Sequence, residues 1–232
     1  MINSASLHSD ISRLGRETDM FLATIESLAE DELPRPSLCG SWSRADVIAH
    51  LASNGRALVK LIDWAVTGEE QQPYASREVR DAEIAEIAAR PRKELLDAFR
   101  ASAAYFSEQA RRLTGDLAVE EVHLHGKRIP VLSIVALRIA EVVVHHNDLD
   151  TAWTIEEADP DSVLDALEAA VRTMRAKDAP GMTLVTEERD EWVIGDGSLR
   201  VESDREGLLE WLSRGHAGYL EADGPLPTLP AW

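Results

Sequence analysis

The feature that most constrains this chain is an apolar stretch, residues 131–149, that also carries an arginine, a glutamate and histidines. Its apolar residues leave no continuous polar face, so the stretch is predicted to be a helix buried on all sides. Arg138, Glu141 and His145 are therefore expected to be buried, and spacings of three and four residues place them on one stripe. A buried glutamate and histidine must be paired or must hold a metal ion, because an isolated buried charge is costly.

Another histidine lies far upstream, in a helix whose beginning the sequence marks. Ser43 is suited to cap this helix, and Asp46 three residues later completes a capping box. His50 borders the apolar stripe of the same helix, so we expect it to point inward. Together with Glu141 and His145 it supplies two nitrogens and one oxygen, the ligands of a catalytic zinc site that keeps one coordination position open. A hydrogen-bonded core histidine beside an ordinary glutamate–histidine helix pair is the alternative, and the residues alone leave both open.

The doublet His145–His146 gives two choices for the last ligand. His145 follows Glu141 by four residues and shares its face, whereas His146 is turned about 100° further round the helix. The spacing therefore favours His145. His146 is expected to support the site or the helix packing instead.

These motifs resemble the mycothiol-dependent maleylpyruvate isomerase family over nearly the whole chain. The resemblance implies an α+β fold, with a DinB-like, metal-binding four-helix bundle at residues 1–155 and a smaller C-terminal α/β domain at 156–232. The second domain is implied to be similar to sterol-carrier folds, with its last helix reaching the metal cleft. The matching elements are Gly40–Ser43 leading to His50, the runs 64–70 and 73–80, Arg138 with Glu141 and His145, Arg214–Gly215, and the proline-rich end.

The same resemblance implies an enzyme, a cis–trans isomerase that depends on a metal and on mycothiol. It would convert maleylpyruvate to fumarylpyruvate in gentisate-type degradation of aromatic compounds. A divalent metal, usually zinc, would be held by His50, Glu141 and His145. A thiolate would add to the cis double bond, the resulting single bond would rotate, and the thiolate would leave. The expected partners are a dicarboxylate substrate and a low-molecular-weight thiol.

Arginines are the candidates for binding the substrate's carboxylates, because the planar guanidinium forms charge-assisted, often bidentate, hydrogen bonds. Arg214 is the first choice as a catalytic residue, by its match to the family's Arg-Gly motif. Satisfying carbonyls at the end of a helix explains Arg214 equally well. Arg138 is expected to hold Glu141 in place, and Arg80 is either a further substrate contact or a surface ion-pair partner.

Charge and composition exclude several other classes of protein. The net charge of -18 argues against binding to nucleic acids or anionic membranes, which require a basic surface. No segment is long and apolar enough to span a membrane and the start lacks a signal peptide, so we expect a cytoplasmic protein. The single cysteine, Cys39, excludes an internal disulfide and fits a reducing compartment. We expect Cys39 to fill space rather than to act as a nucleophile.

The hydrophobic pattern predicts the remaining elements. Long helices at about 5–29, from Ser43 onward, at 92–113 and at 131–149 would form the bundle, with a small hairpin at 122–130 before the last. The composition changes after Trp153. A helix at 162–177, strand-like runs at 182–186, 191–194 and 199–201, and a last helix capped by Ser203 with Glu206 and ending near Arg214 indicate a mixed domain.

Two other functions remain open from the sequence. One is a mycothiol S-transferase on the same scaffold, which would consume thiol stoichiometrically where an isomerase regenerates it. The other is a non-enzymatic module in which the bundle and the C-terminal domain enclose an apolar ligand. Such a module would carry no bound divalent metal.

Overall fold

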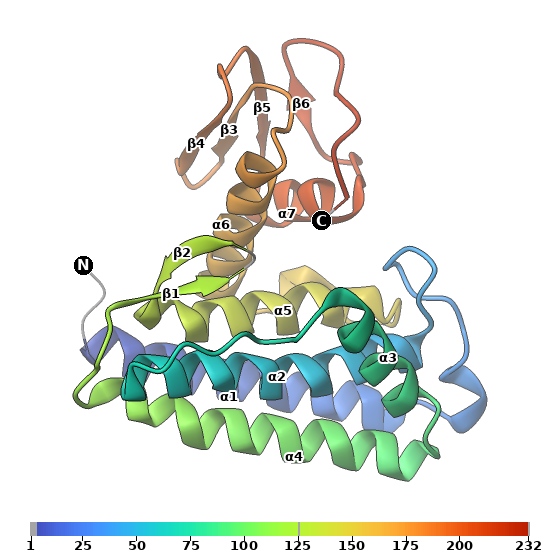
Figure 1. The fold of residues 1–232 in the computed structure, drawn as a ribbon. Coiled ribbons are helices and arrows are strands. Elements are labelled where there is room, and N and C mark those ends of the chain that lie inside the picture. The colour runs from blue at the N-terminus through green and yellow to red at the C-terminus, as the bar shows by residue number, and fades with distance from the viewer. Residues whose placement is uncertain (1–3, 125, 232) are drawn as a thin grey trace. The chain divides into compact units, whose positions relative to one another are not determined.

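The computed structural model describes residues 4–124 and 126–231, and the chain divides into two compact units, Met1–Trp153 and Thr154–Trp232. The first unit is built on four long helices that lie side by side (Figure 1). Around the bundle, α1 and α2 each pack against both α4 and α5. The predicted α+β class with a helical bundle is confirmed. The four helices are α1 (Ser4–Ser27), α2 (Arg44–Thr67), α4 (Arg92–Ala110) and α5 (Ile134–Asp148).

Helix α2 begins and ends where its sequence dictates. The Ser43 hydroxyl accepts the Asp46 N–H at 3.2 Å, and the Asp46 carboxylate accepts the Ser43 N–H at 2.8 Å, so the predicted capping box is present. At the other end Gly68 adopts a left-handed conformation with φ of 79°, and its N–H donates to the Trp64 carbonyl at 2.8 Å. These two caps define the ends of the helix that carries His50.

Helix α5 carries most of the candidate ligands and is buried over nearly its whole length. Residues 142–149 are all buried. The helix begins later than expected because Val131–Ser133 form a 3-10 turn, η3, ahead of it. Ala136, Leu137 and Glu141 are intermediate in burial, and the Glu141 side chain is 27% exposed. The expectation that Glu141 is buried is therefore confirmed only in part.

Shorter elements connect the long helices of the first unit. Helix α3 (Arg77–Ala88) packs on α2, and the predicted hairpin is formed by β1 (Glu121–Leu124) paired antiparallel with β2 (Lys127–Pro130). Two 3-10 turns, η1 (Glu30–Glu32) and η2 (Arg111–Thr114), follow α1 and α4. Within the described residues, no helix combines the length and the apolar character needed to cross a membrane.

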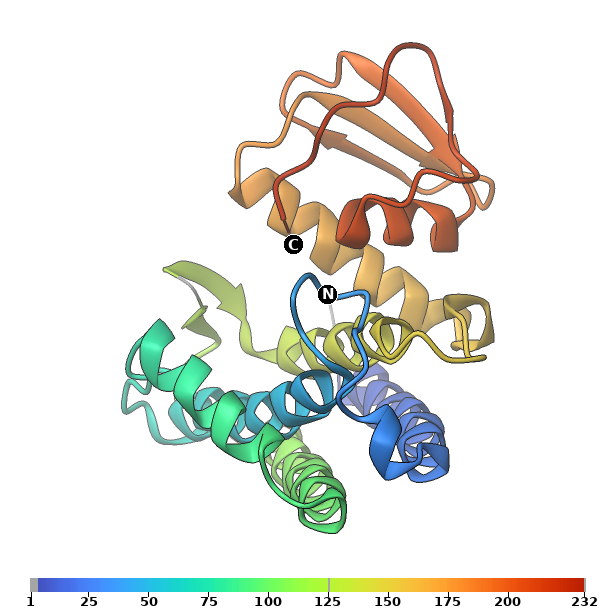
Figure 2. The ribbon, with the colours of Figure 1, turned by 90° about the vertical axis from the view of Figure 1, so that its right-hand side faces the viewer.

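The second unit is a four-stranded sheet with two helices on one face (Figure 2). After the 3-10 turn η4 (Ile155–Glu157), helix α6 (Pro160–Ala176) leads to the sheet, and α7 (Arg205–Arg214) follows β5. The strand order is β4-β3-β5-β6, with β5 parallel to β3 and the other pairs antiparallel. The strands are β3 (Met182–Thr186), β4 (Glu191–Ile194), β5 (Leu199–Ser203) and β6 (Glu221–Ala222).

Side-chain hydrogen bonds mark the start of α7 and the edge strand β4 in this unit. The capping residue of α7 is Asp204, whose carboxylate accepts the Gly207 N–H at 2.7 Å, so the predicted Ser203 cap is wrong by one residue. The reason is that β5 continues through Ser203, whose hydroxyl donates to the Tyr219 carbonyl. At the edge strand β4, the Arg175 guanidinium of α6 donates to the Val193 carbonyl oxygen at 3.0 and 2.8 Å.

Candidate metal centre

Side chains from α2 and α5 converge at one point of the first unit. His50 Nε2 lies 2.8 Å from Glu141 Oε2, and His145 Nε2 lies 3.6 Å from the same oxygen. One ligand atom from each of the three residues lies within 4.8 Å of the other two. Donors at these separations can surround a single cation, and three protein ligands leave a further coordination position for another molecule. The nitrogen and oxygen donors therefore fit a divalent metal ion.

Asp148 orients His145 from behind. Its carboxylate lies 2.6 Å from His145 Nδ1 and is 0% exposed, so it fixes the proton on that nitrogen and leaves Nε2 facing Glu141. The backbone carbonyl of Asp148 accepts the Leu38 N–H, which ties the loop before α2 to the end of α5. Asp148 was not among the predicted site residues. The signal was a carboxylate three residues after His145, at the end of an otherwise apolar helix.

His146 points away from the cluster, toward α1. Its Nε2 lies 2.7 Å from the Thr24 hydroxyl, and its ring stacks on Trp153 with centroids 3.7 Å apart and planes inclined by 8°. The Phe21 ring contacts the His146 ring in a T-shaped arrangement. His146 therefore packs α5 against α1, while His145 is the member of the doublet that lies beside Glu141 and His50.

Trp42 and Arg80 lie against the two imidazoles. The Trp42 ring is centred 5.2 Å from the His50 ring and 6.1 Å from the His145 ring. Arg80 of α3 places its guanidinium carbon 5.7 Å from the Trp42 ring centre and its Nη2 3.4 Å from His50 Nδ1. Arg80 also forms an ion pair with Asp81, which is the alternative role that the sequence left open for it. It nevertheless reaches the cluster.

Arg138 lies deeper in the bundle. It is 1% exposed, and its Nη1 donates to the Asn54 side chain at 2.7 Å. Its Nη2 has no hydrogen-bond partner among the described residues. The charge of Arg138 acts on Glu141 and helps to keep the pKa of that carboxyl low. Arg138 thus influences Glu141 through its electric field, while its hydrogen bond goes to α2.

The local environment sets the protonation states that metal ligands need. Burial lowers the pKa of His50 to about 4, and the hydrogen bond to Glu141 offsets this only in part. Burial acts to raise the pKa of Glu141, but the hydrogen bond with His50 and the charges of His50, His145 and Arg138 outweigh it and bring the value to about 2. At neutral pH His50 is neutral and Glu141 is an anion, and both forms can bind a metal ion without losing a proton.

Tyr74 borders the cluster from the segment between α2 and α3. Its hydroxyl lies 3.1 Å from the Ser53 hydroxyl of α2, and its electrostatic neighbours include Glu141 and Arg80. Burial raises the pKa of Tyr74, so the phenol keeps its proton at neutral pH. Tyr74 was not among the predicted site residues, because a tyrosine in a loop carries no spacing signal.

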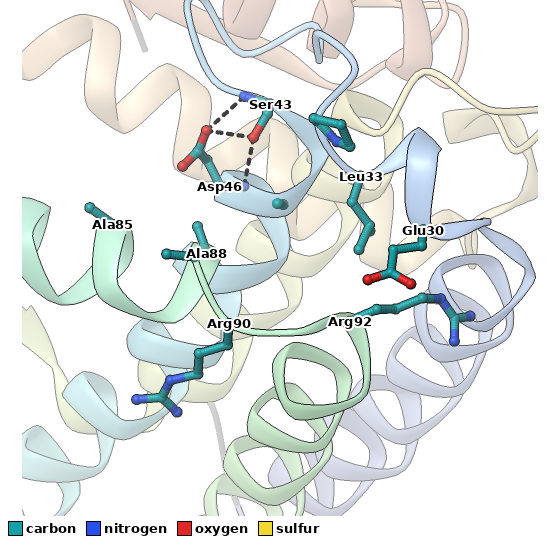
Figure 3. A pocket seen from close by; sticks show the side chains of 11 residues that line it. Glu30, Leu33, Ser43, Asp46, Ala85, Ala88, Arg90 and Arg92 are labelled. Carbon is teal, nitrogen blue, oxygen red and sulfur yellow. Dashed lines mark hydrogen bonds between the residues drawn. The ribbon is translucent and has the colours of Figure 1, made fainter.

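Cys39 lies near the centre, whereas a pocket at the start of α2 lies apart from it. Cys39 is half-buried, and its sulfur lies within 4.8 Å of ligand atoms of His145 and Asp148, beside the centre rather than in the apolar core. A pocket at the start of α2 is lined by side chains from α2, α3 and the loop before α2 (Figure 3). None of the predicted ligands lines it, and its Ser43 and Asp46 point toward one another in the capping box.

Arg214, the predicted catalytic arginine, is the last residue of α7 in the second unit. Its Nη1 donates to the Ser213 carbonyl at 2.6 Å, and Gly215 ends the helix in a left-handed conformation. This is the helix-terminal contact that the sequence left open as an alternative. The catalytic role of Arg214 stays a prediction.

Comparison with known proteins gives a consistent result. Residues 14–150 match the family described as the mycothiol maleylpyruvate isomerase N-terminal domain. Two solved structures are similar over 100% of this chain and 100% of their own, each with 25% sequence identity and a TM-score of 0.85. They are the mycothiol-dependent maleylpyruvate isomerase and a variant of it with a histidine replaced by alanine. No curated protein sequence matches the chain significantly.

Proposed function

The chain belongs to the mycothiol-dependent maleylpyruvate isomerase family, and from this premise we propose that it converts maleylpyruvate to fumarylpyruvate with a divalent metal ion and mycothiol. The observation that carries the proposal is the convergence of His50, Glu141 and His145 from two helices. Two imidazole nitrogens and one carboxylate oxygen form a ligand set typical of catalytic zinc. Zinc is therefore the metal that we propose.

When bound, such an ion lowers the pKa of a coordinated thiol, so that the sulfur is a thiolate at neutral pH. His50, Glu141 and His145 would hold the ion, and Asp148 keeps His145 in the orientation that exposes Nε2. The thiolate sulfur forms a bond to one carbon of the cis double bond, and the electron pair of that bond moves onto the conjugated ketone oxygen. Rotation about the new single bond, return of the electron pair and departure of the thiolate give the trans product.

Arg80 is proposed to bind a carboxylate of the substrate. A histidine that ligates a metal through Nε2 carries its proton on Nδ1. His50 would then present an N–H donor at the position where Arg80 Nη2, another donor, lies 3.4 Å away. Two adjacent donors, one of them a cation, suit an anionic oxygen. The Trp42 ring under the guanidinium helps to keep Arg80 at this position.

The other arginines have separate proposed roles. Arg138 keeps Glu141 ionised through its charge. Arg214 is proposed to bind the second carboxylate, as the family resemblance implies, from a C-terminal domain at residues 156–232 similar to sterol-carrier folds. A dicarboxylate requires more than one cationic contact on a chain whose net charge is -18, because the overall field repels anions.

The test is an isomerisation assay with purified protein. Maleylpyruvate is supplied with and without mycothiol, to metal-replete and chelator-treated protein. We expect fumarylpyruvate only when both metal and thiol are present. His50→Ala should lose the bound metal and at least about 1,000-fold in activity, the scale on which loss of essential groups acts. His123→Ala, on the hairpin, is the matched control and should retain both.

The outcomes separate the competing functions. Turnover without thiol would contradict the proposed isomerase. Stoichiometric loss of thiol, with a stable conjugate as product, would identify a mycothiol S-transferase. Purified protein without a divalent metal, together with a His50→Ala variant of unchanged stability, would favour a binding module for apolar ligands.

A further inference from the structure

Tyr74 is held at the edge of the metal centre by contacts from α2. The Pro73 carbonyl accepts a hydrogen bond from Lys60 Nζ at 2.9 Å, and Pro73 is buried, so the backbone before Tyr74 is fastened to the helix. The phenol hydroxyl lies 3.1 Å from Ser53 Oγ, and Ser53 is 1% exposed. Ser53 follows His50 by three residues and therefore lies on the same face of α2. The tyrosine hydroxyl is thus directed to the ligand-bearing side of the helix.

The charges around Tyr74 belong to the same centre. Its phenol interacts electrostatically with Glu141 and Arg80, and with the buried Arg138. Tyr74 is half-buried, so a bound molecule can reach it. The other two tyrosines, Tyr105 and Tyr219, are more exposed, at 44% and 81%.

The proposed reaction creates a charge that the metal ligands do not address. When the thiolate sulfur bonds to carbon, the electron pair of the double bond moves to the conjugated ketone oxygen, which becomes an enolate. A pre-placed hydrogen-bond donor stabilises such an oxygen more than it stabilises the neutral ketone, and so lowers the barrier. The donor need not give up its proton, because expulsion of the thiolate returns the electron pair to carbon.

We propose that Tyr74 is a catalytic residue whose hydroxyl donates a hydrogen bond to the enolate oxygen formed on thiolate addition, with Ser53 positioning that hydroxyl. The inference rests on the proposed isomerase function. Either hydroxyl of this pair can donate, and the proposed role is the one in which Ser53 is the donor, so that the phenol hydrogen is left for the bound molecule. The carboxylate contacts of the substrate are made by other groups, so Tyr74 acts on the reaction and not on affinity.

The experiment compares Tyr74→Phe, Ser53→Ala and Tyr105→Phe in the metal-replete enzyme with mycothiol. Tyr74→Phe should lower kcat and kcat/KM by the same factor, about 100-fold, as for loss of one donor to a developing oxyanion. Its metal content and its affinity for a saturated analogue of the substrate, which cannot form the enolate, should be unchanged. Ser53→Ala should lower kcat only a few-fold, and Tyr105→Phe should match the wild type.

Each alternative has its own signature. Equal losses in Tyr74→Phe and Ser53→Ala would show that the hydrogen bond merely holds the loop, and would overturn the catalytic role. A Tyr74→Phe enzyme within two-fold of the wild type, or one whose loss lies only in KM or in metal content, would also overturn it. A wild-type protein that fails to isomerise the substrate with metal and thiol present contradicts the proposed function itself, and with it this inference.

Discussion

The two units differ most in what they bury. The first unit buries ionisable side chains, including His50, Arg138, His145, His146 and Asp148. Among the described residues of the second unit, the buried polar side chains are hydroxyls only: Ser162, Thr186, Ser203 and Ser213. Burying ionisable groups lowers stability unless each is paired, whereas buried hydroxyls readily bond to nearby backbone. The first unit therefore accepts a cost that the second avoids, and this difference indicates where the chemistry takes place.

The largest difference between the two units should appear in their stability at acid pH. In chelator-treated protein, burial lowers the pKa of His50 to about 4 and the pKa of His146 to about 3, below the ordinary value of 6.5. The unfolded chain then takes up protons first, so stability is lost as the pH falls below about 6.5. From pH 6.5 to 4.5 we expect a loss of roughly 2–3 kcal/mol for each histidine. Glu141, whose pKa is lowered to about 2, adds a further loss below about pH 4.5.

The measurement is urea unfolding of the metal-free protein at several pH values, with hydrogen exchange to distinguish α5 from β3. His50→Gln should remove about half of the stability loss expected from the two histidines between pH 6.5 and 4.5, because it removes one of the two whose pKa is lowered. Equal acid sensitivity of α5 and β3 would contradict the contrast between the units.

Truncation of a core side chain in the second unit should affect the packing of that unit alone. Leu184 of β3 is 0% exposed and faces Val201 across the parallel pair. Leu184→Ala should lower the free energy of unfolding of that unit by about 2–5 kcal/mol through lost burial and a residual cavity. The bound metal per chain should not change. Metal loss in this variant would show that the centre depends on the second unit's core.

The smallest of the effects that distinguish the two units concerns one carboxylate from each of them. Asp148→Asn should weaken metal binding by about 10–100-fold, because the amide orients His145 less well than the carboxylate does. Asp190→Asn is the matched control: Asp190 accepts a hydrogen bond from Arg205 Nε at 2.7 Å in the second unit, and we expect no change in metal affinity. Competition with a chromophoric chelator measures both. Similar losses in the two variants would remove Asp148 from its proposed role.

The sequence predicted the bundle because each of its signals is local. The Ser43–Asp46 box, the apolar period of α2 and α5, and the spacing of Glu141 and His145 all depend on residues within one or two turns of each other. The approach of His50 to that pair followed from both helices burying their apolar faces in one bundle.

Contacts that depend on connecting segments were not predictable. Trp42 and Tyr74 reach the centre from the loop before α2 and the segment after it, and no periodicity fixes where such segments lie. The partial exposure of Glu141 was also missed, because an apolar helix pattern does not show how far each position is buried. The cap of α7 was misplaced since strand β5 extends through Ser203.

Arg175 has a consequence for how this acidic chain behaves in a crowded solution. An edge strand such as β4 offers unpaired backbone groups, onto which a strand of another molecule can dock. The guanidinium of Arg175 already occupies the Val193 carbonyl with two donors, so an incoming strand would have to displace a cation to pair with that oxygen. The opposite border of the sheet is only two residues long. Both edges of the sheet therefore disfavour pairing with a strand of another molecule, and with it the fibrillar aggregates to which such pairing leads.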